Sequence, residues 1–112
     1  MQLNITNITC VNPARAVKDD VFFVIQADGG QPTRYPPQGA LPAGSGEALK
    51  LPDGGLNVPY TYGVCVTAFN FRFLESNQYL FNIWVDYESS NMTETKYNNN
   101  HAEYSITRNI LV

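Results

Sequence analysis

The fold is decided by one stretch of the chain, YLFNIWVDY at residues 79–87. Large apolar side chains recur there with a period of two residues, at Tyr79, Phe81, Ile83, Val85 and Tyr87. This period is typical of a β-strand that turns one face towards a core. Trp84 is out of phase with that set, so we expect its indole on the opposite face of the strand.

Other segments carry the same type of signal. The run VFFVI at 21–25 is apolar throughout, which predicts a central strand buried on both faces or nearly so. Apolar positions alternate over 3–10 with a change of phase near Asn7, and over 60–73 with a change near Ala68. A change of phase predicts a β-bulge. A last strand is expected over 104–112.

The region 31–59 differs, because it holds six of the seven prolines and five of the eight glycines. Proline at this density is incompatible with long helices and central strands. We expect loops there, with two short edge strands at 33–35 and 48–51. The polar segment 89–100 is expected to form one long exposed loop.

The length of 112 residues fits one domain, which we expect to span residues 1–112. Alternating apolar segments separated by turn residues, with no convincing helical period, predict an all-β fold. We therefore expect an antiparallel β-sandwich of about six to eight strands.

The net charge, the length of the apolar runs and the pattern of the first residues argue against several classes of protein. A net charge of −3, with seven Lys and Arg, argues against nucleic acid as a partner. No apolar run approaches the roughly 20 residues of a transmembrane helix. Residues 1–6 alternate polar and apolar, unlike a secretory signal, so we expect a cytoplasmic protein or one released without an N-terminal signal peptide.

Catalytic motifs are missing from the sequence. His101 is the single histidine, and neither a nucleophile elbow nor a phosphate-binding loop occurs. Cys10 and Cys65 are too few and too far apart for a zinc site. Both lie in apolar stretches, which favours buried thiols over a disulfide, although the sequence leaves a bridge open. We expect a non-catalytic protein.

Carboxylates gather where strands begin or end. Asp20 directly precedes the apolar run at 21–25, whereas Asp86, Glu88 and Glu94 follow the run that ends at Val85. If these loops lie at one end of the sandwich, the carboxylates converge and repel one another. A hard cation with oxygen ligands would relieve that repulsion, and Asn91 could complete the shell.

These residues resemble a known family. The sequence DDVFFVI at 19–25 is similar to C2 domains, in which an Asp opens a strand after the first calcium loop. IWVDYE at 83–88, with Glu94, resembles their third loop, Asp-X-Asp-X5-Asp, with Glu at the second and third acidic places. The resemblance implies a C2-like sandwich, with a jelly-roll arrangement as the alternative, a Ca²⁺ cofactor and an anionic lipid surface as partner. The calcium ligands that it implies are Asp20, Asp86, Glu88 and Glu94.

Two other binding functions remain open. Trp84, Tyr87 and Asn91 could bind a glycan, because an aromatic face packs on the C–H side of a sugar ring while polar groups bind its hydroxyls. Alternatively, Phe69, Phe71 and Phe73 could form a flat face that pairs with a copy of itself, which would make the protein a homo-oligomeric structural component. The same three rings could instead belong to the core. The sequence thus predicts a binding or interaction module for a protein, glycan or lipid surface.

Overall fold

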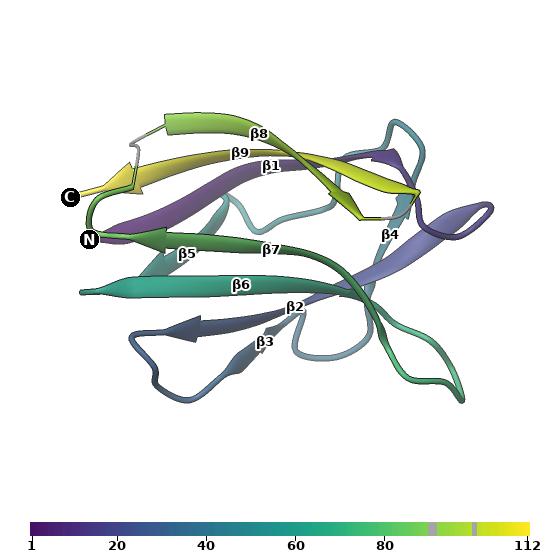
Figure 1. Ribbon diagram of the computed structural model, residues 1–112, viewed down its shortest axis with the longest axis horizontal. Coiled ribbons are helices and arrows are strands. Elements are labelled where there is room, and N and C mark those ends of the chain that lie inside the picture. The colour runs from purple at the N-terminus through teal and green to yellow at the C-terminus, as the bar shows by residue number, and fades with distance from the viewer. Residues whose placement is uncertain (90–91, 100) are drawn as a thin grey trace.

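The computed structural model describes residues 1–89, 92–99 and 101–112, with the backbone alone for 92–99. Two antiparallel sheets pack face to face (Figure 1). The first has the order β5 (Leu56–Pro59), β1 (Gln2–Asn12), β9 (Ala102–Leu111) and β8 (Met92–Asn99). The second has the order β3 (Thr33–Tyr35), β2 (Lys18–Ala27), β6 (Gly63–Asn70) and β7 (Gln78–Asp86), and β4 (Leu41–Gly44) also pairs with β2.

This arrangement confirms the predicted all-β antiparallel sandwich. The described residues form nine strands, and the two predicted β-bulges are present as shifts of register. One lies in β1 between Ile5 and Asn7, and the other lies between Ala68 and Phe69 of β6. None of the described residues belongs to a helix long and apolar enough to cross a membrane.

Two local predictions of secondary structure were wrong. The polar segment 89–100 contains strand β8, because an edge strand needs only backbone pairing with β9 and no apolar period. The edge strand expected at 48–51 is a single bridge between Ala48 and Thr9, and the strands that the region 31–59 does form are β3, β4 and β5. β4 tolerates Pro42 because this strand pairs with β2 alone.

The three phenylalanines expected on one face do not share one. Phe69 lies on the outer face of β6 and stacks on Phe22 of β2, with ring centroids 5.5 Å apart. The strand ends at Asn70, so Phe71 and Phe73 lie in the following loop, where both are exposed. They are part of neither the core nor a flat sheet face.

The core consists of the inward-facing residues of both sheets. On the second sheet these include Val21, Phe23 and Ile25 of β2 and Ile83 and Val85 of β7, all of which are buried. The two thiols are free, since Cys10 is buried in this core and Cys65 lies half-buried on the outer face of β6. The preference for unbridged cysteines is therefore confirmed.

A buried carboxylate ties the two sheets together at one end. Asp19 is fully buried and accepts hydrogen bonds from the backbone N–H groups of Ala14 and Arg15, at 2.9 and 3.1 Å. It also accepts one from the Asn70 amide at 2.9 Å and one from the Tyr104 hydroxyl at 2.6 Å. Burial, and then the bond to Asp19, raise the pKa of Tyr104, so its phenol remains a proton donor.

Removing this donor should destabilise the fold. We expect Tyr104→Phe to lower the free energy of unfolding by about 1–3 kcal/mol, because the buried Asp19 loses one of its four donors. Urea unfolding followed by circular dichroism measures the change. Tyr62→Phe, on an exposed ring, is the control and should leave stability unchanged. Equal effects of the two substitutions would contradict the role given to Tyr104.

Candidate functional site

The functional residues predicted from the sequence fall at two opposite ends of the sandwich. We call one end the loop pole; it carries the connections 13–17 and 71–77. The other, the terminal pole, carries both termini, the turn at 28–30, the segment 60–62 and the turn at 86–89 (Figure 1). The long axis of the molecule, 39 Å, runs between these poles.

Asp20 and Asp86 lie at different poles. Phe71, which follows β6, donates its backbone N–H to the carbonyl of Asp20, whereas Asp86 pairs with Gly63 at the opposite end of β6. Gly63 is level with Asp28. At ~3.3 Å per residue, the eight residues from Asp20 to Asp28 correspond to roughly 26 Å of strand. The expectation that the four carboxylates converge was wrong, because it depended on a strand order that the sequence does not reveal.

The other predicted ligands stay near one another in the chain. The Asp86 carboxylate accepts the backbone N–H of Glu88 at 2.8 Å and the Ser89 hydroxyl at 3.3 Å, and so closes the turn after β7. Glu94 lies in β8, paired with Thr107, rather than in a loop. Asn91 lies outside the described residues. Among the side chains that the structure describes, no group of three or more acids, histidines or cysteines converges to hold a metal ion.

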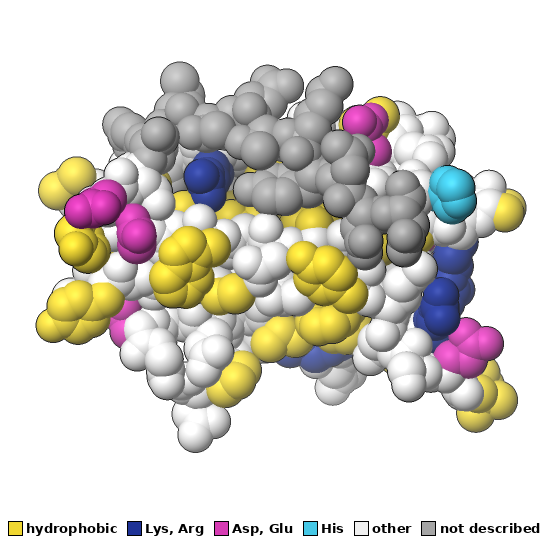
Figure 2. All heavy atoms as spheres, viewed as in Figure 1, with side chains coloured by type: hydrophobic (Ala, Val, Ile, Leu, Met, Phe, Trp, Pro, Cys, Tyr) yellow, Lys and Arg dark blue, Asp and Glu magenta, His cyan; other side chains and the backbone are white. Residues whose placement is uncertain are grey.

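The loop pole carries exposed apolar side chains, of which the sequence pattern had marked Phe71 and Phe73 but not Val17 or Leu74. Val17, Phe73 and Leu74 are 81%, 79% and 89% exposed, and Phe71 is also exposed. The two loops are joined, because the Arg15 guanidinium donates to the carbonyl of Phe71 at 3.1 Å. Figure 2 shows hydrophobic tips at the right-hand end of the molecule, with Lys and Arg side chains between them.

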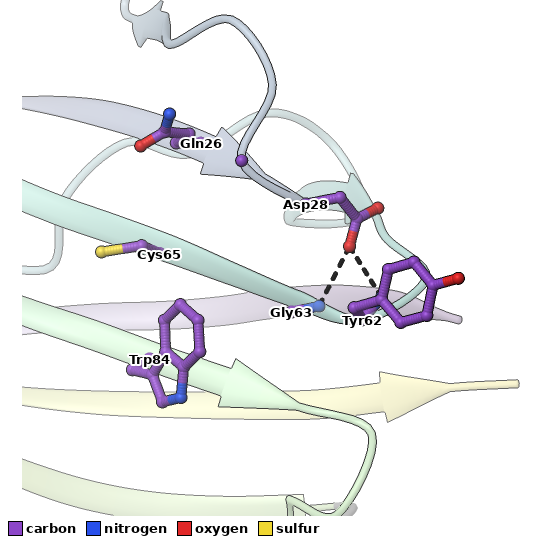
Figure 3. Close-up of a pocket in the computed structure, with 7 residues that line it drawn as sticks. Gln26, Asp28, Tyr62, Gly63, Cys65 and Trp84 are labelled. Carbon is purple, nitrogen blue, oxygen red and sulfur yellow. Dashed lines mark hydrogen bonds between the residues drawn. The ribbon is translucent and has the colours of Figure 1, made fainter.

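The terminal pole carries a pocket on the outer face of the second sheet (Figure 3). It has a volume of about 330 Å³. Gln26 of β2 and Cys65 of β6 are paired, as are Cys65 and Trp84 of β7, so the three side chains form one row across the sheet. The full lining consists of Gln26, Asp28, Gly29, Tyr62, Gly63, Cys65 and Trp84.

Asp28 fixes the wall of this pocket. Its carboxylate accepts the backbone N–H groups of Thr61, Tyr62 and Gly63 at 2.8, 2.7 and 3.0 Å. The bonds from Gly63, Tyr62 and Thr61 lower the pKa of this carboxyl, in that order of effect. The charged carboxylate therefore holds the segment 61–63 beside the turn at 28–30.

Sequence reasoning predicted one of the residues that line this pocket. Trp84 projects from the outer face, as its phase predicts, and is 60% exposed. Tyr87 is exposed nearby but does not line the pocket. Gln26 and Asp28 were missed, and Tyr62 was not placed beside Trp84, because these residues meet only through the pairing of β2, β6 and β7.

Comparisons with known proteins bear on the fold. No protein-family model matches the sequence, and no curated protein matches it. A human GIVD cytosolic phospholipase A2, solved in complex with methyl gamma-linolenyl fluorophosphonate inhibitor and terbium chloride, aligns with 96% of this chain at a TM-score of 0.56 and 7% identity. Only 16% of that phospholipase chain is covered. A structure described as a C2 domain aligns over 100% of this chain and 99% of its own length, at a TM-score of 0.53 and 9% identity. The fold is therefore C2-like, as the resemblance implied.

The lowered pKa of Asp28 has a consequence for stability at acid pH. Its carboxylate stabilises the fold above the ordinary value of 3.8, and this contribution is lost as the pH falls through the lower folded-state pKa. We expect Asp28→Asn to lower the melting temperature at pH 7, and we expect the gap from wild type to narrow below pH 3.8. Thermal unfolding at a series of pH values measures it, with Asp53→Asn as an exposed control. A difference in melting temperature between wild type and Asp28→Asn that is the same at every pH would contradict this account.

Proposed function

We propose that this chain is a non-catalytic binding module that docks on a lipid bilayer through its loop pole. The observation that carries the proposal is the exposure of Val17, Phe73 and Leu74 on two neighbouring loops at one end of the sandwich. Large apolar side chains gathered at one end of a protein mark a surface that binds another apolar phase or partner. The C2-like fold is consistent with a binding role.

Insertion of these side chains provides the driving force. Moving a Val, Leu or Phe side chain out of water stabilises by about 1.5–3 kcal/mol each. Three such side chains on loops already held together by the contact from Arg15 to Phe71 need little further ordering. The loop pole can therefore enter the interface of a bilayer as a preformed unit.

The charges of the loop pole indicate which lipids suffice. Lys18 lies 3.3 Å from Asp20, and Arg72 lies 3.5 Å from Glu75, so two of the cations are already paired. Attraction to anionic headgroups, worth about 1 kcal/mol per unpaired cation, is correspondingly small. We infer that docking depends on apolar insertion, proceeds on zwitterionic lipid and varies little with salt.

The backbone at Leu74 supports a role outside folding. Leu74 has φ of 63°, a left-handed conformation that costs a bulky residue about 1–3 kcal/mol. This residue is 89% exposed, so packing within the chain does not offset the strain. Asn tolerates the same conformation and is polar.

Substitution of Leu74 should separate docking from stability. We expect Leu74→Asn to weaken binding to phosphatidylcholine vesicles by about tenfold or more, because one apolar tip is lost. Its melting temperature should be unchanged or higher, because the backbone strain is reduced. Vesicle co-sedimentation, with and without a calcium chelator, measures binding.

Val112→Asn is the matched control, because Val112 is an exposed aliphatic residue at the terminal pole. It should leave vesicle binding unchanged. A wild-type protein that stays in solution with every vesicle preparation would overturn the proposal. A concentration-dependent mass in sedimentation that Leu74→Asn abolishes, without any vesicle binding, would show that the tips bind a second copy instead.

Calcium binding at the terminal pole is the second candidate function. Its support is the C2-like spacing of Asp86, Glu88 and Glu94 along one stretch of chain, from the last residue of β7 into β8. Asp20 has no part in this reduced set. Such a site would supply oxygen ligands to Ca²⁺ at the pole opposite the apolar tips.

Calcium should raise the melting temperature of the wild-type protein if this second candidate is correct, because a ligand of the native state stabilises it. Asp86→Asn should remove the shift. Asp20→Asn, the matched control, should retain it, since Asp20 lies at the loop pole. No shift with the wild type, or the same loss in both variants, would exclude the reduced set.

A further inference from the structure

We infer that the pocket at the terminal pole binds a single neutral pyranose ring, stacked on Trp84. This site is independent of the proposed docking at the loop pole, because the two lie at opposite ends of the molecule. The inference rests on four features of the pocket: an exposed aromatic face, polar groups opposite it, the absence of a cation in the lining, and its size.

The indole of Trp84 is held in place from one side and left open on the other. A Cβ atom at Gly63 would lie 3.2 Å from the Cη2 atom of Trp84, so the missing side chain is what lets the ring lie against β6. Figure 3 shows the ring extending from β7 towards Gly63. The ring is nonetheless 60% exposed. It thus offers a rigid, flat apolar surface of the kind that packs on the C–H face of a sugar.

Polar groups lie across β6 from this ring. The Gln26 side-chain NH2 group donates to the carbonyl of Gly30 at 2.8 Å, which fixes the side chain. The carbonyl oxygen of the same amide is an acceptor for a ligand hydroxyl. Asp28 accepts three backbone N–H groups, and a carboxylate has about four acceptor sites. Both groups suit sugar hydroxyls, which approach from the edge of a stacked ring.

The charge of the lining excludes anionic ligands. Of the seven lining residues, all described, Asp28 alone is charged. No Lys, Arg or His is present to neutralise a phosphate or carboxylate, and Asp28 would repel one. Phosphosugars and uronic acids are therefore excluded, and a cationic ligand is distinguished from a neutral ring by the choline probe below.

The volume limits the size of the ligand. About 330 Å³ lies at the lower end of the range for small-molecule pockets, roughly 300–1,000 Å³. It suits one sugar ring rather than several. With one stacked face and few polar contacts, the dissociation constant should be on the order of millimolar.

The single tryptophan makes a direct test possible, because all indole fluorescence comes from Trp84. The full chain is titrated separately with methyl glucoside, methyl galactoside and methyl mannoside. We expect a saturable change in the intensity or wavelength of emission with at least one of them. Glucuronic acid and choline serve as an anionic and a cationic probe, and neither should saturate.

Two variants locate the binding. Gln26→Ala should raise the dissociation constant by about two- to tenfold, because one hydrogen bond to a hydroxyl is lost. Tyr87→Ala is the matched control: its exposed ring lies at the same pole but outside the pocket, so affinity should not change. Melting temperatures confirm that both variants fold.

The outcomes separate this inference from the proposed function. If both sites exist, we expect Leu74→Asn to leave sugar binding intact. We likewise expect Gln26→Ala to leave vesicle binding intact. Failure of vesicle binding alone leaves the sugar pocket standing. The pocket assignment is overturned if no methyl glycoside changes the emission, if only choline or glucuronic acid does, or if Tyr87→Ala weakens binding as much as Gln26→Ala.

Discussion

The cross-strand register of β2, β6 and β7 is the constraint on which the rest of the molecule depends. Because Gln26 pairs with Cys65 and Cys65 with Trp84, three residues far apart in sequence form one row at the terminal pole. The same register carries Asp20 to the other end, beside Phe71. A shift of one residue would turn the inward set of each strand outwards, so the buried side chains of the core keep this register fixed.

The Asp19 carboxylate plays the corresponding part at the loop pole. It binds Tyr104 of the first sheet, Asn70 of the second, and the backbone of the loop at Ala14 and Arg15. A buried carboxylate is costly unless its acceptor sites are used, and here four donors use them. The apolar tips are thus carried on loops whose base is anchored in the core, although the tips themselves touch water.

Local sequence patterns predicted most of the single strands but did not predict which strands pair with one another. The bulges near Asn7 and Ala68, and the outward position of Trp84, followed from a period of two residues, which is a property of a single strand. β8 escaped prediction because its polar residues carry no such period and its backbone pairs with β9 alone. The separation of Asp20 from Asp86 depends on which strands pair, and Phe73 looked like part of a strand because alternation does not mark where pairing ends.

The opposite placement of the two candidate surfaces constrains how they can act together. A bilayer contacted by Leu74 and Phe73 approaches along the 39 Å axis of the molecule, from the end farthest from Trp84. The pocket would then face the aqueous side, most of that length away from the lipid interface. Headgroups of the docked membrane cannot reach it, so a sugar there must come from solution or from a neighbouring molecule. Docking and sugar binding share no residue and no charge, so neither ligand should change the affinity of the other unless the strands between them move.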